Sequence, residues 1–138
     1  MDSLKQMAEA VIAGDAEQCV TLAKKAIQEK LDPVEAVQQG FSKGMDTVGR
    51  KFESGEMFLP EMMQAAEAMN AGVAVLKPAI ESSGSGKLQY FGKCVLATIQ
   101  GDMHDIGKNI VKLLLATTGF DIVDLGKDVK VGVIIDRA

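Results

Sequence analysis

The pattern of apolar residues changes once along the chain, at a serine- and glycine-rich segment formed by residues 82–86. Before this segment, apolar side chains recur every three or four residues, which is the period of an amphipathic helix. After it, short apolar runs of strand length alternate with glycine-containing loops. The sequence therefore predicts two units: a helical unit of residues 1–86, which includes a flexible linker, and an α/β unit of residues 87–138.

Start and stop signals in the first unit predict four helices. The first helix ends at Gly14, and Asp15 can cap the second. Asp32 followed by Pro33 marks the start of the third, because an N-cap acceptor precedes a proline at the first helical position. Its apolar residues recur at spacings of 3, 4, 4, 3 and 4: Val34, Val37, Phe41, Met45, Val48 and Phe52. Pro60 opens the fourth helix, so the unit is expected to be a small antiparallel four-helix bundle.

The second unit reads as strand, loop, helix and strand. Residues 93–99 and 120–125 are mostly apolar runs that suit buried strands. Between them a loop is followed by a helix expected to begin at residue 105 or 106 and to end at residue 118. This order predicts a right-handed βαβ unit, the start of a Rossmann-like (flavodoxin-like) sheet. Residues 129–138 are expected to open a further helix.

Two parallel strands and the helix between them leave a sheet with open edges and an uncovered face. We therefore expect the Rossmann-like unit to be incomplete, truncated after its second strand. Either the sequence is a fragment or another chain completes the sheet, and the fragment is the preferred interpretation.

Composition excludes several classes of function. The formal net charge is −4 and no Lys/Arg cluster is present, so neither nucleic acid nor an anionic membrane is an expected partner. The single histidine excludes zinc sites and iron sites that need several imidazoles. Cys19 and Cys94 cannot form a disulfide framework and are expected to be small buried apolar residues. The sequence contains no signal peptide and no apolar stretch near the ~20 residues that span a bilayer, so a cytoplasmic protein is expected.

The loop of residues 101–109, with the sequence GDMHDIGKN, contains that histidine, His104. Ligands of open α/β sheets bind beyond the carboxyl ends of the strands, where this loop is expected. Asp102 could accept a hydrogen bond from one imidazole nitrogen and leave the other free for a metal. A phosphate-binding loop is excluded, because five residues separate Gly101 from Gly107. From spacing alone, a solvated polar pair and a metal ligand both remain open.

A resemblance narrows these alternatives. The pattern Asp102-x-His104-x-x-Gly107 resembles the signature of cobalamin-binding domains of the methionine-synthase type, and the segment Phe52–Met62 is similar to the helical cap of the same family. The resemblance extends over essentially the whole chain. It is strongest to corrinoid proteins of methyltransferase systems that act on methylamines, methanol, betaines or aryl methyl ethers.

The resemblance implies roles for particular residues. His104 would be the lower axial ligand to cobalt, replacing the dimethylbenzimidazole of the cofactor (base-off, His-on), and Asp102 would be its hydrogen-bond partner. The residues expected to line the corrin and its nucleotide tail are Gly101, Asp102, Met103, Asp105, Ile106, Gly107 and Asn109. The family's later motifs around that tail are expected beyond Ala138.

The helical unit is expected to cover the upper face of the corrin. The residues proposed for this lid are Phe58, Ala65, Ala68 and Met69. Four methionines lie between positions 57 and 69, namely Met57, Met62, Met63 and Met69. Ordinary packing of the bundle by an adaptable side chain is the alternative interpretation of these methionines.

The implied function is a methyl carrier. Such a protein binds cobalamin, methylcobalamin in its loaded state, and shuttles a methyl group between a substrate-specific methyltransferase and an acceptor methyltransferase. It would be one subunit of a multi-component enzyme and would not catalyse the transfer alone. The alternatives are a cobalamin-dependent sensor or regulator, a B12 mutase subunit, and a helical bundle with an inert histidine. The sequence does not identify the methyl donor, the acceptor or the oligomeric state.

Overall fold

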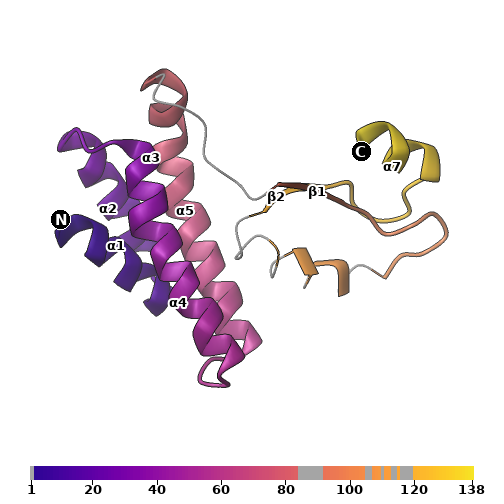
Figure 1. The fold of residues 1–138 in the computed structure, drawn as a ribbon, viewed down its shortest axis with the longest axis horizontal. Helices are drawn as coiled ribbons and strands as arrows, with labels where there is room; N and C mark the ends of the chain where they lie inside the picture. The colour runs from indigo at the N-terminus through magenta and orange to yellow at the C-terminus, as the bar shows by residue number, and fades with distance from the viewer. Residues whose placement is uncertain (1, 84–91, 105–106, 110, 113–114, 116–119) are drawn as a thin grey trace. The chain divides into compact units, whose positions relative to one another are not determined.

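The computed structural model of the 138-residue chain describes residues 2–83, 92–104, 107–109, 111–112, 115 and 120–138. The chain divides into two compact units, Met1–Leu88 and Gln89–Ala138. The first unit is helical and the second contains a small parallel sheet (Figure 1).

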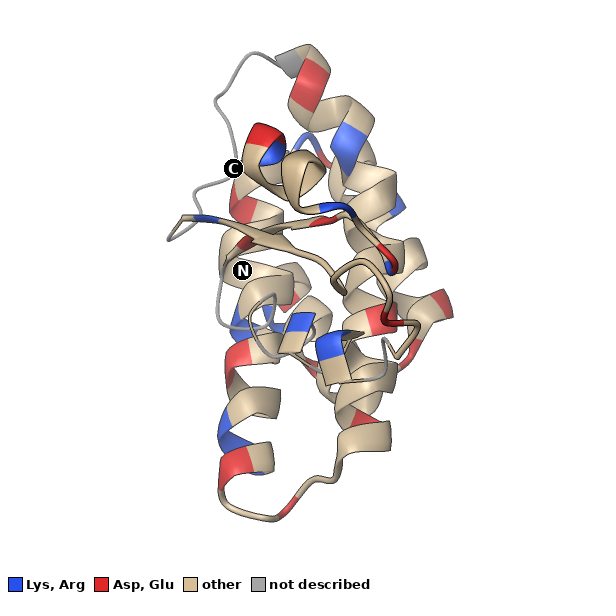
Figure 2. Cartoon of the chain, turned by 90° about the vertical axis from the view of Figure 1, so that its right-hand side faces the viewer, with Lys and Arg blue, Asp and Glu red and all other residues tan. Residues whose placement is uncertain are grey.

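The first unit is a bundle whose helices run side by side in Figure 1. Its elements are α1 (Asp2–Ala13), α2 (Ala16–Gln28), α3 (Pro33–Glu35), the π-helical segment η1 (Ala36–Phe41), α4 (Ser42–Glu53) and α5 (Leu59–Ser83). The most extensive contact joins α2 to α5, and α1 packs against α2, η1 and α4. Acidic and basic residues are interspersed along the helices (Figure 2), as expected for solvated helix faces.

The predicted capping residues begin two of these elements. The Asp15 carboxylate accepts a hydrogen bond from the Gln18 amide at 3.0 Å, and the Asp32 carboxylate accepts one from the Val34 amide at 2.9 Å. Each bond satisfies a backbone N–H that has no partner within its helix. Gly14 has a φ of +68°, a conformation that glycine adopts at low cost after a helix.

The core of the bundle contains the predicted apolar stripe. The largest fully buried side chains are Phe41, Met7, Met62, Leu76, Val11, Val48 and Cys19. Burial, reinforced by the negative charge of Asp15, raises the pKa of the Cys19 thiol to about 11. Cys19 is therefore a neutral, apolar part of the core, as the sequence predicts.

Three features of the first unit differ from the sequence prediction. The third predicted helix contains the π-helical segment η1, and α5 begins at Leu59 rather than at Pro60. Helix α5 also continues through Ser82 and Ser83, which the composition assigns to the linker. The Ser82 hydroxyl donates to the carbonyl of Ala79 at 3.3 Å, so this serine bonds back onto its own helix instead of ending it. The remainder of the predicted linker lies outside the described residues.

The second unit contains two parallel strands, β1 (Lys93–Leu96) and β2 (Asp121–Asp124), in the register that pairs Lys93 with Asp121 and Leu96 with Asp124. Both strands are shorter than predicted, and β1 is followed by an isolated bridge between Ile99 and Val129. Between the strands, the described residues of the predicted helix, 107–109, 111–112 and 115, are helical. Helix α7 (Val131–Arg137) follows β2.

Within the described part of the chain, no helix combines the length and the apolar character that crossing a bilayer requires.

Candidate functional site

The segments that leave the two strands at their carboxyl ends lie side by side. The amide of Thr98 donates to the carbonyl of Gly126 at 2.9 Å, and the amide of Gln100 donates to the carbonyl of Val129 at 2.8 Å. The amide of Val129 returns a hydrogen bond to the carbonyl of Thr98 at 2.9 Å. These bonds extend the parallel pairing beyond β1 and β2. The segment that contains His104, of which residues 101–104 are described, begins where they end and is called the histidine loop below. The loop therefore starts from an ordered edge of the sheet.

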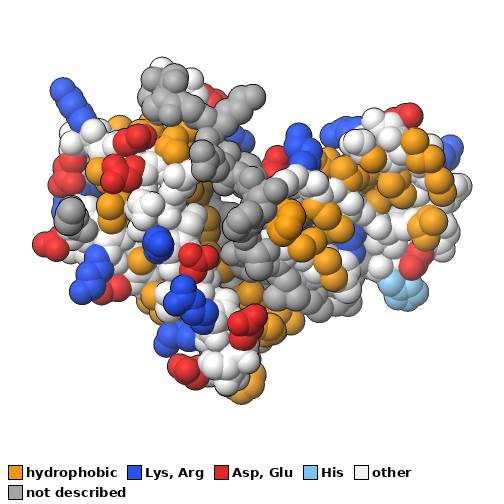
Figure 3. Space-filling model, viewed as in Figure 1, with side chains coloured by type: hydrophobic (Ala, Val, Ile, Leu, Met, Phe, Trp, Pro, Cys, Tyr) orange, Lys and Arg blue, Asp and Glu red, His pale blue; other side chains and the backbone are white. Residues whose placement is uncertain are grey.

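His104 projects from this loop into solvent. Its side chain is 98% exposed, and the imidazole stands out from the molecular surface in Figure 3. Oδ1 of Asp102 accepts two hydrogen bonds from the same residue, one from the backbone amide of His104 and one from its Nδ1, each 2.8 Å long. A carboxylate two residues before the ring thus orients both the backbone and the imidazole.

The protonation states follow from these contacts. The hydrogen bond from the His104 backbone amide, and then the one from its imidazole, hold the pKa of Asp102 below its ordinary value. Asp102 is therefore an ionised carboxylate that can only accept, so Nδ1 of His104 carries the proton. The lone pair of a neutral ring is then on Nε2, the nitrogen that is not bonded to Asp102, and a free lone pair of this kind is what a metal would require.

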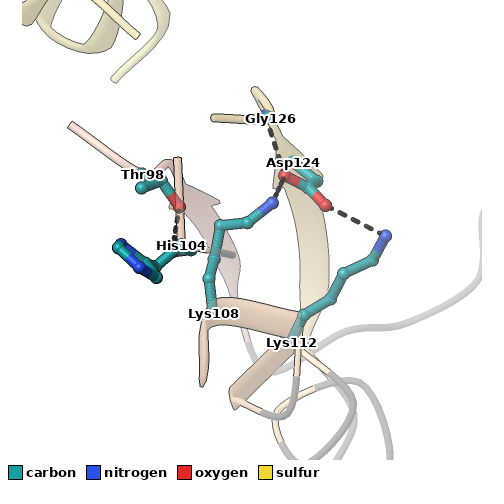
Figure 4. A network of polar contacts seen from close by, with 6 residues as sticks. All are labelled: Thr98, His104, Lys108, Lys112, Asp124 and Gly126. Atoms are coloured by element: carbon teal, nitrogen blue, oxygen red, sulfur yellow. Dashed lines mark hydrogen bonds and ion pairs between the residues drawn. The ribbon is translucent and has the colours of Figure 1, made fainter. Parts of the chain in front are cut away.

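A second residue, Thr98, also holds the backbone of His104. The hydroxyl of Thr98 donates to the carbonyl oxygen of His104 at 3.4 Å, and Thr98 is 7% exposed (Figure 4). In Figure 4 the imidazole points away from the charged side chains of Lys108, Lys112 and Asp124. The main chain at His104 is thus anchored to the sheet, while its ring extends into solvent with only Nδ1 bound to Asp102 among the described residues.

The surroundings of the imidazole leave room for a large ligand. Gly101 has a φ of +89°, and, apart from its chain neighbours, no described residue lies within 4 Å of a Cβ built on Gly101 or on Gly107. Met103, the residue before His104, is 58% exposed and Ile99 is 54% exposed. One nitrogen ligand beside apolar side chains suits a metal whose other ligands belong to a macrocycle, as in a corrinoid. The residues present therefore fit a cobalamin cofactor.

The loop brings several of the predicted cofactor-binding residues together. Gly101, Asp102, Met103 and His104 are consecutive in the loop, and Gly107 and Asn109 lie in the helical residues that follow. Asp105 and Ile106 lie outside the described residues.

The residues predicted for the lid differ in exposure. Phe58 is 68% exposed just before α5, and Met69 is half-buried on that helix. Ala65 and Ala68 are fully buried in the core of the helical unit. Direct contact with a ligand is therefore open to Phe58 and Met69, whereas the two alanines set how closely the helices pack.

A cluster of charged residues that the sequence did not predict lies at the end of β2. Oδ1 of Asp124 is 2.6 Å from Nζ of Lys108, and Oδ2 is 3.2 Å from Nζ of Lys112 (Figure 4). The Gly126 amide also donates to Oδ1 at 2.9 Å. The hydrogen bond from Lys108, followed by those from Gly126 and Lys112, lowers the pKa of Asp124 to about 2. The sequence feature that could have indicated this cluster is Asp124 itself, a polar residue at the carboxyl end of a strand.

Comparison with known proteins places the chain in a family. A family model described as "B12 binding domain" matches residues 3–77, more than half of the chain. A corrinoid protein of Desulfitobacterium hafniense (strain Y51) is 44% identical over 130 residues, which cover 94% of this chain and 60% of that protein. Trimethylamine corrinoid protein 1 of Methanosarcina mazei is 43% identical over 130 residues, with the same coverage of 94% and 60%.

A solved structure of a cobalamin-dependent complex also matches the chain. The crystal structure of the methanol:cobalamin methyltransferase complex from Methanosarcina barkeri contains a chain that matches with a TM-score of 0.86 at 34% identity. The match covers 99% of this chain and 51% of that one, which confirms the predicted fold class of a helical cap followed by a Rossmann-like domain. The chain spans about 60% of the length of the two curated relatives. A chain that shares this much sequence with corrinoid proteins belongs to the B12-binding domain family, and its cofactor is cobalamin.

Proposed function

We propose that this protein is a corrinoid methyl carrier that holds cobalamin through Nε2 of His104. The observation that carries the proposal is the pairing of His104 with Asp102, in which a 2.8 Å hydrogen bond occupies Nδ1 of a side chain that is 98% exposed. The ring is thereby held in the tautomer that a metal requires, with its free nitrogen facing solvent. A surface histidine that binds no ligand does not require a fixed tautomer.

The other loop residues have distinct roles in the proposal. Asp102 fixes the tautomer and strengthens imidazole donation to cobalt. Gly101 and Gly107 let the corrin approach the backbone, because no side chain intervenes. Met103 supplies apolar contact. Asp105, Ile106 and Asn109 complete the lining proposed for the corrin and its nucleotide tail.

The helical unit is proposed to protect the upper face of the cofactor. Phe58 and Met69 present apolar surface that can exclude water, and the buried alanines Ala65 and Ala68 maintain the spacing of the helices behind them. Exclusion of water and oxidants is the contribution that a protein makes to a reactive cofactor of this kind.

When bound, cobalamin supplies a cobalt centre that takes up a methyl group and later releases it. We infer two partners, a substrate-specific methyltransferase that delivers the methyl group and an acceptor methyltransferase that removes it. The names of the relatives support this inference, since they include a trimethylamine corrinoid protein and a methanol:cobalamin methyltransferase complex. The carrier would not turn over alone, because both transfers require the active sites of the partners.

The proposed ligation can be tested by electron paramagnetic resonance of the protein loaded with Co(II) cobalamin. An axial nitrogen splits the cobalt signal into a triplet when it is nitrogen-14 and into a doublet when it is nitrogen-15. Because the chain has one histidine, labelling histidine alone with nitrogen-15 addresses only His104. We expect the triplet to become a doublet in the labelled protein.

Unlabelled protein and the His104→Ala variant are the controls. The variant should lose the splitting from histidine and bind cobalamin more weakly, by at least the roughly 10–100-fold that loss of a residue orienting a metal ligand costs. A triplet that persists in histidine-labelled protein would show that benzimidazole or another nitrogen occupies the axial position, and the proposal would be wrong.

A further inference from the structure

Asp128, in the segment after β2, has a backbone conformation that only one other described non-glycine residue shares. Its φ is +54°, in the left-handed region, and the other such residue is Lys30, with a φ of +57°. Left-handed backbone is unfavourable for residues with a side chain, although Asp and Asn tolerate it better than most. The conformation therefore persists only where surrounding contacts stabilise it.

The two hydrogen bonds that join Asp128 to other described residues both lead to the histidine loop. Oδ1 of Asp128 accepts a hydrogen bond from the amide of Gly101 at 2.8 Å, across 27 positions of sequence. The backbone amide of Asp128 donates to the carbonyl of Asp102 at 3.2 Å. One residue thus binds two consecutive residues of the loop, one through its side chain and the other through its backbone.

These bonds hold the loop immediately before the residues that orient the imidazole. Asp102 is fixed at its carbonyl by Asp128, and its carboxylate receives both hydrogen bonds from His104. Thr98 holds the carbonyl of His104 on the other side. The position of the ring consequently depends on two anchors, and Asp128 is the one that acts through Asp102.

We propose that Asp128 is a positioning residue for the axial ligand: it fixes the turn at Gly101 and Asp102 so that His104 is presented to cobalt in a single orientation. The inference rests on the proposed function for its link to cobalt, but its effect on the imidazole is independent of any cofactor. Asp128 itself contacts neither His104 nor the ring nitrogens among the hydrogen bonds of the described residues.

Two substitutions separate the side-chain hydrogen bond from the backbone conformation. Asp128→Asn keeps a carbonyl oxygen that can accept from the Gly101 amide, and asparagine tolerates left-handed backbone. Asp128→Gly removes the acceptor but relieves the unfavourable φ, so the variant is expected to fold. Lys127→Ala is the matched control, because this neighbouring residue is exposed and makes no hydrogen bond to the histidine loop in the described part of the chain.

The first measurement uses the cofactor-free protein. The nitrogen chemical shifts of the single imidazole, recorded by NMR under alkaline conditions where an ordinary imidazole is neutral, report which ring nitrogen carries the proton. We expect wild-type protein, Asp128→Asn and Lys127→Ala to show the Nδ1-protonated ring, and Asp128→Gly to show averaging of the two nitrogens. In wild-type protein the Gly101 amide should also exchange slowly with solvent, because Asp128 accepts its hydrogen.

The second measurement is the affinity for cobalamin. We expect Asp128→Gly to bind about 10-fold more weakly than wild type, at the lower end of the effect of residues that orient metal ligands. Asp128→Asn and Lys127→Ala should bind like wild type. In the Co(II) form, Asp128→Gly should show a reduced fraction of histidine-ligated cobalt.

The two proposals fail in different ways. Unchanged imidazole shifts in Asp128→Gly, a rapidly exchanging Gly101 amide, or equal impairment of Asp128→Asn and Asp128→Gly would each overturn the role of Asp128. Averaged imidazole shifts in Asp128→Gly together with a cobalt signal that lacks histidine splitting in wild-type protein would instead overturn the ligation and leave the positioning role intact.

Discussion

Asp124 shows how a single carboxylate can join distant parts of the second unit. It ends β2, and both of its lysine partners come from the helical residues that follow the histidine loop. The side chain of Lys108 is 9% exposed and that of Asp124 is 21% exposed, so the pair is partly shielded from water. The ion pair therefore links the segment after His104 to the end of the second strand.

This pair predicts a dependence of stability on pH. The hydrogen bond from Lys108, with those from Gly126 and Lys112, lowers the pKa of Asp124 from 3.8 to about 2 in the folded protein. A carboxylate with a lowered pKa stabilises the fold above its ordinary pKa, and this contribution is lost as the pH falls from about 4 towards about 2. We expect Asp124→Asn to lower the free energy of unfolding by about 1 kcal/mol at neutral pH, since residual solvation screens the pair.

Urea unfolding followed by circular dichroism measures the effect. The difference between wild type and Asp124→Asn should shrink towards zero at about pH 2, where wild-type Asp124 is also losing its charge. Asp136→Asn, on the exposed surface of α7, is the control. A difference that stayed constant between neutral and acidic pH would contradict the prediction.

At the residue scale, the sequence predicted those parts of the site that depend on local order along the chain. His104 and Asp102 are two positions apart, so their hydrogen bond could be anticipated from the motif. The bond from Gly101 to Asp128 spans 27 positions and depends on a left-handed φ at an aspartate, neither of which has a sequence signature. Long-range contacts through an unusual backbone conformation could only be found in the structure.

At the element scale, the starts of α2 and α3 followed from capping chemistry, whereas the bounds of α5 and the π-helical segment η1 did not. The apolar spacing in this region fits an α-helix equally well, so the pattern does not reveal a widened turn. Gly40 lies in η1, where an added Cβ would approach Sδ of Met7 to 2.8 Å. Close packing against α1 is a tertiary contact that the local sequence does not specify.

The same packing argument gives a stability prediction for α5. A Cβ on Gly72 would lie 2.5 Å from Cζ of the buried Phe41. We expect Gly72→Ala to lower the free energy of unfolding by roughly 1–3 kcal/mol, because overpacking of a rigid ring outweighs the gain in helix propensity.

Gly49 on α4 is the matched control, since nothing lies within 4 Å of a Cβ built there. Gly49→Ala should raise the free energy of unfolding by up to about 1 kcal/mol. Thermal unfolding of both variants checks the prediction, and equal stabilisation by the two alanines would contradict it.

At the scale of the whole molecule, the change in periodicity was enough to predict a helical part followed by a Rossmann-like part. Strand lengths were overestimated, because apolar character continues beyond Leu96 while the chain leaves the ladder and pairs again only at Ile99 and Val129. The proposed protection of the cofactor by the helical unit predicts a role for Phe58.

Phe58→Ala should speed the oxidation of the reduced, cobalamin-loaded protein by dioxygen several-fold, because the variant lacks a large apolar side chain proposed to exclude oxidants. Its unfolding temperature should not change, since the Phe58 side chain is 68% exposed and contributes little packing. Ile27→Ala, which removes an exposed apolar side chain from α2, is the control. Oxidation at the same rate in wild type and both variants would show that Phe58 does not protect the cofactor.

The hydrogen bond between Asp102 and His104 has a kinetic consequence. Both residues belong to one short stretch of chain, only two positions apart, so the bond between them needs no contribution from a cofactor. A binding site that is already in its bound conformation need not rearrange when the ligand binds. Under the proposed ligation, the rate of cobalamin binding would then be limited by dissociation of benzimidazole from the cobalt of free cobalamin. A conformational change of the protein would not limit it.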